Sequence, residues 1–105
     1  MQKSKLPLLE ICCSTIQSAL NAEAGGADRI ELCVGLEVGG LTPSPAMIRM
    51  ALSKVNIPIH VLIRPRPGDF CYSPIEFEAL KLDIQFCRMI GVAFLRPEPL
   101  LVLHL

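Results

Sequence analysis

The sequence lacks an excess of charge and lacks long hydrophobic runs. Ten Lys and Arg balance ten Asp and Glu, so the formal net charge is zero, and there is no basic surplus of the kind that binds nucleic acid. No uninterrupted apolar run reaches the ~20 residues that span a bilayer. The basic start MQKSKLPLLE carries Glu10 inside an apolar run too short for a signal peptide. We therefore predict neither a nucleic-acid nor a membrane partner.

The sequence also lacks the cysteine spacing of zinc and disulfide modules. Its five cysteines are an odd number and contain no C-x-x-C pair. Reduced thiols in a cytoplasmic setting are therefore expected. Hydrophobic residues make up 51% of the chain, which excludes a disordered segment and is sufficient for one core.

Three strand–helix units are predicted along the chain. The apolar runs LPLLEICC, DRIELCV and IHVLIRP are each followed by a helix start. The first start is a capping box of Ser14 and Gln17, and the second is Ser44–Pro45. The third, Ser73–Glu76, combines an N-cap, a first-turn proline and a glutamate. Such alternation predicts an α/β fold with a parallel sheet.

The spacing of these units favours part of a barrel. A (β/α)8 barrel uses ~30 residues per unit, and the three units fill about the first 90 residues, although a doubly wound sheet also fits. We expect residues 1–92 to form the three units and residues 93–105 to be a divergent tail, because Pro97 and Pro99 disfavour a fourth strand. The sheet would then have order 1-2-3 with open edges, and we expect self-association.

Two Glu-x-Cys pairs end the first two strands. Side chains two apart share a face, so Glu10 joins Cys12 and Glu31 joins Cys33. Because neighbouring strands lie ~4.8 Å apart, we expect the two thiols to lie side by side at the carboxyl ends, where barrels build their sites. Soft thiolates select Cu(I). The alternative is that both are small buried hydrophobes, as we expect for Cys13, Cys71 and Cys87.

Charged residues gather near the same ends of the strands. Buried charges need partners, so we expect Arg64 to neutralise a strand glutamate. The set could instead form a pocket in which arginine grips a small anion, and both alternatives remain open. The candidate pocket residues are Glu10, Glu31, Arg64, Arg66 and Asp69.

Several motifs together resemble one family. LEICCSTIQSALNAEAGGADRIELC, IPIHVLIRPRPGDFCYS and EFEALKLDIQFCRMIG resemble the N-terminal part of the copper homeostasis protein CutC family. Departures are Ser14 for an aspartate, Val34 for a small polar residue and Pro67 for a glycine. After about Ala93 the sequence leaves the family pattern, so we expect a truncated form with a divergent tail.

The resemblance implies a TIM barrel and a role in copper homeostasis, in the cytoplasm and also the nucleus. It implies copper as Cu(I), held by Cys12 and Cys33, and homo-oligomeric full-length relatives. We predict a Cu(I)-binding protein rather than an enzyme, inactive if the truncation leaves the site incomplete. The alternative is a barrel enzyme for a small anionic substrate, with Glu31 or Asp69 as acid or base and Arg64 with Arg66 as anion clamp.

Overall fold

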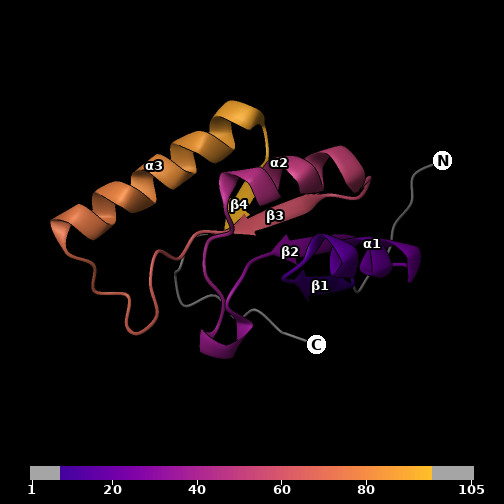
Figure 1. Cartoon of the computed structure of the whole chain (residues 1–105), viewed down its shortest axis with the longest axis horizontal. Coiled ribbons are helices and arrows are strands. Elements are labelled where there is room, and N and C mark those ends of the chain that lie inside the picture. The colour runs from indigo at the N-terminus through magenta and orange to yellow at the C-terminus, as the bar shows by residue number, and fades with distance from the viewer. Residues whose placement is uncertain (1–7, 96–105) are drawn as a thin grey trace.

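The chain folds as alternating strands and helices that form one parallel sheet. The computed structural model describes residues 8–95 of the 105. The strands pair in the order β1-β2-β3-β4, all parallel, as the α/β prediction required, and the helices lie together over one face (Figure 1). The elements in chain order are β1 (Glu10–Cys13), α1 (Ile16–Ala24), β2 (Arg29–Leu32), η1 (Leu36–Val38), α2 (Pro45–Lys54), β3 (Ile59–Leu62), α3 (Pro74–Ile90) and β4 (Ala93–Leu95).

Side-chain caps fix where the helices begin. Ser44 accepts a hydrogen bond from the Met47 amide before α2, and Ser73 forms a reciprocal capping box with Glu76 before α3, both as predicted. The prediction for α1 is wrong by one residue, because Thr15 is its N-cap and pairs with Ser18. Thr15 has the extended backbone, φ −141° and ψ 159°, that turns a cap side chain toward the first turn.

The apolar core lies between the helices and one face of the sheet. Alternate residues of each strand point to the same face, and on this face they are apolar. Burying such surface contributes roughly 25 cal/mol per Å², so this interface holds the sheet and helices together. The strand residues in the core include Cys13, Ile30, Leu32, Ile59 and Val61, and the helix residues include Ala19, Ala22, Ile48, Ala51, Leu80 and Cys87.

A fourth strand corrects the expectation that regular structure stops before residue 93. Ala93–Leu95 pair in parallel with β3, from His60 to Leu62. Gly91 makes this possible because its φ of 78° ends α3 and turns the chain back toward the sheet. Three residues complete the strand before Pro97, so the prolines do not interfere. The remainder of the predicted tail, residues 96–105, lies outside the described residues.

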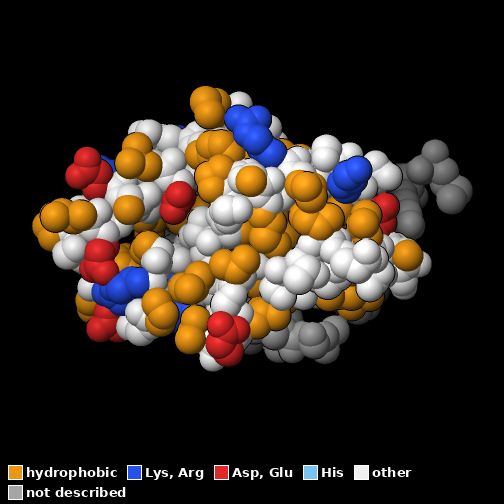
Figure 2. Space-filling view, in the orientation of Figure 1, with side chains coloured by type: hydrophobic (Ala, Val, Ile, Leu, Met, Phe, Trp, Pro, Cys, Tyr) orange, Lys and Arg blue, Asp and Glu red, His pale blue; other side chains and the backbone are white. Residues whose placement is uncertain are grey.

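The outer surface of α3 carries apolar side chains in contact with solvent. Ile75, Leu82 and Met89 recur every seven residues and are 80%, 59% and 72% exposed. Orange side chains are scattered over α2 and α3 in Figure 2. The part of the chain that the structure describes contains no helix long and apolar enough to cross a membrane.

Candidate functional site

The strand register places chemistry-bearing side chains in one row on the face opposite the core. Cys12 is the cross-strand partner of Glu31, and Glu31 is the partner of His60. Cys33 lies two residues after Glu31, just past the end of β2, and donates its backbone N–H to the Cys13 carbonyl, 3.1 Å away. The expectation that Cys12 and Cys33 lie directly side by side is therefore corrected: they are diagonal neighbours, with Cα atoms roughly 8 Å apart by strand geometry.

Glu31 is a buried carboxylate at the centre of this row. It is 1% exposed, and it acts on both thiols. Burial, the charges of Glu31 and Cys33, and a hydrogen bond with Glu31 raise the pKa of Cys12 to about 12. Burial and the charge of Glu31 raise the pKa of Cys33 to about 11. Both thiols are therefore protonated at neutral pH, and Glu31 is the charged neighbour that they share.

An ion pair closes the opposite end of β1 and β2. Glu10 accepts a hydrogen bond from Arg29 Nε, and the two residues are cross-strand partners. The predicted ion-pair layer thus exists for Glu10, but its partner is Arg29 rather than Arg64. Glu10 lies two residues before Cys12 on the same face of the sheet. The Glu10–Arg29 ion pair therefore lies next to the row that contains Cys12 and Glu31.

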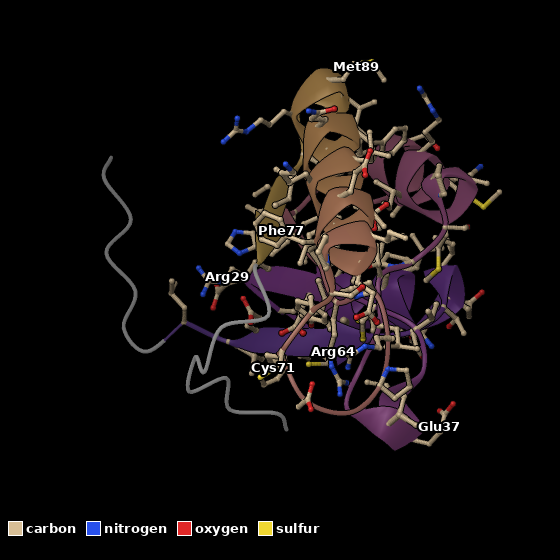
Figure 3. The ribbon with its side chains drawn as sticks, turned by 90° about the vertical axis from the view of Figure 1, so that its left-hand side faces the viewer. Arg29, Glu37, Arg64, Cys71, Phe77 and Met89 are labelled. Carbon is tan, nitrogen blue, oxygen red and sulfur yellow. The ribbon has the colours of Figure 1, made fainter. Side chains whose placement is uncertain are left out.

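Arg64 follows β3 and joins two loops instead of neutralising a strand glutamate. Its Nη1 donates to the carbonyls of Val38 and Gly40, at 2.6 and 3.0 Å, and its Nη2 donates to Gly68 at 3.1 Å. Its backbone N–H also donates to Thr42 Oγ1 at 2.8 Å. Figure 3 shows Arg64 near Cys71 at the loop end of the molecule, with Met89 at the far end.

The glycine turn, defined here as residues 35–40, covers Cys33. Gly39 and Gly40 have φ of 91° and 96°, a conformation that side chains disfavour. A Cβ on Gly40 would lie 2.7 Å from Leu62 Cδ2 and 3.8 Å from Cys33 Sγ. Two backbone hydrogen bonds between Val34 and Leu41 close the base of the turn. Cys33, beside this turn, is only 1% exposed.

Arg66 and Asp69 form a separate network in the loop before α3. Arg66 pairs with Glu76 and with Asp69, and donates to the carbonyls of Asp69 and Cys71, both at 2.9 Å. A hydrogen bond from the Cys71 backbone N–H, and then the one from Arg66, lower the pKa of Asp69. The hydrogen bond from Arg66 lowers the pKa of Glu76. Because the guanidinium fork is already engaged, the network weighs against Arg66 as an anion clamp. Its role is to hold the loop to the start of α3.

The other cysteines lie away from the row. Cys13 and Cys87 are buried in the apolar core, and Cys71 is exposed in a loop. All five cysteines lie outside disulfides. Within residues 8–95 no cluster of three or more His, Cys, Asp or Glu side chains has a geometry suited to a metal ion.

Sequence reasoning missed two members of this neighbourhood. His60 stands in the row beside Glu31, and its Nδ1 is buried with no hydrogen-bond partner among the described residues. His60 lies four residues before Arg64 in IHVLIRP, so the sequence predicts that the two share a face of the sheet. That Glu31 is the cross-strand neighbour of His60 depends on the strand register. Thr42 accepts a hydrogen bond from the Arg64 backbone N–H, and no sequence motif predicts this contact.

Comparisons with known proteins match this segment to one family. A CutC family protein of Erwinia tasmaniensis is 55% identical over 83 residues, which are 79% of this chain and 33% of that protein. The human copper homeostasis protein cutC homolog is 51% identical over 84 residues, 80% of this chain and 31% of that protein. The chain thus spans about a third of the length of these relatives.

A solved structure agrees with the fold. The crystal structure of a CutC protein from Streptococcus agalactiae aligns with a TM-score of 0.75 at 33% identity, covering 83% of this chain and 43% of that one. The described β/α units therefore correspond to part of the CutC barrel. The model of the CutC family matches residues 7–95, including the fourth strand, and the chain belongs to the CutC family.

Proposed function

We propose that this segment supplies the thiol ligands of a Cu(I) site, with Cys12 and Cys33 as the two donors. What supports the proposal is their placement as diagonal neighbours on one face of the sheet, at the carboxyl ends of neighbouring strands. Thiolates are the soft donors that Cu(I) prefers. The human relative is named a copper homeostasis protein. We infer a copper role for this chain from its similarity to that protein.

The raised thiol pKa values give the proposed site a proton dependence. Cys12 and Cys33, with pKa values of about 12 and 11, must each lose a proton to bind a metal. Exchange of two protons for one Cu(I) adds one negative charge beside Glu31. Below pH 11 the apparent affinity should therefore rise up to about 100-fold per pH unit, or roughly 2.7 kcal/mol.

Competition with a chromophoric Cu(I) chelator under reducing conditions tests the ligands. We expect Cys12→Ser and Cys33→Ser each to weaken binding by at least about tenfold, and the double variant to abolish specific binding. Cys13→Ser is the matched control, because Cys13 neighbours Cys12 in sequence but lies in the core, and its affinity should be unchanged. An unchanged affinity in the double variant would refute the proposal.

Glu31 gives a second, independent test. If its charge acts by suppressing thiolate formation, Glu31→Gln should lower both thiol pKa values. A total decrease of about one pKa unit, summed over the two thiols, would strengthen Cu(I) binding at pH 7 by about tenfold. If Glu31 were itself a ligand, the same change would weaken binding. Ultraviolet thiolate absorbance followed against pH checks the pKa shift without any metal.

A further inference from the structure

Cys33 is more deeply buried than Cys12, and the glycine turn is one of its near neighbours. It lies outside the apolar core cluster yet is 1% exposed. The buried Gly40 packs beside it, because a Cβ added to Gly40 would lie 3.7 Å from Cys33 Cβ and 3.8 Å from Cys33 Sγ. A ligand reaching this thiol from the loop end must therefore displace the glycine turn.

One side chain holds the glycine turn against the rest of the protein. Arg64 donates to Val38 and Gly40 within the turn and to Gly68 in the following loop. Its guanidinium also lies 5.6 Å from the Phe70 ring. Hydrogen bonds from a charged donor are about twice as strong as neutral ones. The Val34–Leu41 bridge at the base leaves the six residues between them as a unit that can swing away.

We propose that Arg64 is a positioning residue that latches the glycine turn over Cys33, so that release of this latch controls access to the thiol. All the side-chain hydrogen bonds of Arg64 in the described structure go to loop carbonyls, so its loss frees the turn without leaving a carboxylate unpaired. That copper is the ligand admitted rests on the proposed function. The latch itself concerns thiol access and is measurable without metal.

Pulsed alkylation with N-ethylmaleimide, read residue by residue by peptide mass spectrometry, tests the latch in the full chain. We expect Arg64→Met to speed labelling of Cys33 by at least about tenfold, equivalent to ~1.4 kcal/mol of closed-turn stability. Cys13 and Cys87, each 1% exposed in the core, are internal controls for global unfolding and should keep their rates. Arg64→Lys, which retains one donor group, should give an intermediate rate.

Two glycines provide a matched pair that does not alter Arg64. Gly40 and Gly26 have nearly the same φ, 96° and 97°, but a Cβ on Gly26 meets nothing within 4 Å. Both alanine variants therefore carry the same backbone strain, and Gly40→Ala alone pushes the turn away from Leu62. We expect Gly40→Ala to speed Cys33 labelling and Gly26→Ala to leave it unchanged.

The outcomes separate the latch from the copper proposal. Cys33 labelling that is unchanged in both Arg64→Met and Gly40→Ala, or that rises only together with Cys13 and Cys87, overturns the latch. Selective labelling of Cys33 supports it even if Cu(I) does not bind. If Cu(I) does bind, its transfer from a chelator should be faster in Arg64→Met while the equilibrium affinity changes less than the rate.

Discussion

The two faces of the sheet differ although they are made from the same short strands. On the helix-covered face, Ile30, Leu32 and Val61 are fully buried and join the core. On the opposite face the alternate positions carry Cys12, Glu31 and His60 in one row. The first face is apolar because helices remove it from water. The opposite face bears titratable groups. One face of the sheet therefore supplies the apolar core, and the other carries the side chains that can react or bind a ligand.

The largest expected difference concerns association. The face opposite the three α-helices, called the open face below, has none of those helices over it (Figure 1). Within residues 8–95 the edge strands β1 and β4 each pair on one side only, and bare edges template pairing with other chains. We expect size-exclusion chromatography with light scattering to show oligomers at micromolar concentration. Leu8→Lys, just before β1 and 50% exposed, should reduce association, whereas Leu82→Lys on α3 should not. A monodisperse monomer would contradict this expectation.

Truncating a side chain should lower the free energy of unfolding by several kcal/mol more on the core face than on the open face. Ile30→Ala leaves a cavity in the core and should lower the free energy of unfolding by about 2–5 kcal/mol. Cys12→Ala, on the open face, should change it by less than about 1 kcal/mol. Urea denaturation followed by circular dichroism measures both. Equal losses would mean that the open face is packed as tightly as the core.

A smaller effect tests the corrected start of α1. Thr15→Ala removes the cap of this helix and should cost about 1 kcal/mol, while Ser14→Ala should fall within about 0.5 kcal/mol of the parent. The same denaturation experiment applies. A larger loss of stability in Ser14→Ala than in Thr15→Ala would mean that Ser14 is the N-cap of α1.

The last expected effect, confined to alkaline pH, is a loss of stability that originates on the open face. Burial and the charge of Glu31 raise the pKa of Cys12 to about 12 in the folded chain from an ordinary value of 9.0, so the unfolded chain loses its proton first. Stability is therefore complete below pH 9 and declines as pH rises toward 12. Cys12→Ser should flatten this decline, while Cys71→Ser, altering an exposed thiol, should not.

The sequence predicted the units and most of their boundaries because local chemistry controls them. Ser44, Ser73 and the apolar stripes act within one or two helical turns, and the structure agrees there. Ser14 and Thr15 are both competent caps, so only the backbone conformation decides between them. The fourth strand was missed because Pro97 and Pro99 disfavour a strand, and the three residues of β4 are too few to show an alternating pattern.

The candidate site was less predictable because it depends on register. Aligning the two Glu-x-Cys motifs would pair Glu10 with Glu31, but the strands are offset by two residues, so that Glu10 meets Arg29 and Cys12 meets Glu31. Such an offset is what a barrel requires, because tilted strands are staggered by its shear. The role of Arg64 depends on loop conformation, which no residue spacing encodes.

The sequential pairing of the strands has a consequence for the newly made chain. Each strand pairs with the one synthesised before it, so β1 and β2 can join as soon as both have emerged. Arg64 is translated roughly 30 residues after Cys33, a delay of roughly 2–6 s at ~5–20 residues per second. If Arg64 latches the glycine turn as proposed, the turn beside Cys33 is unlatched during that interval. Oxidation or metal capture at Cys33 would then be governed by translation speed rather than by the finished fold.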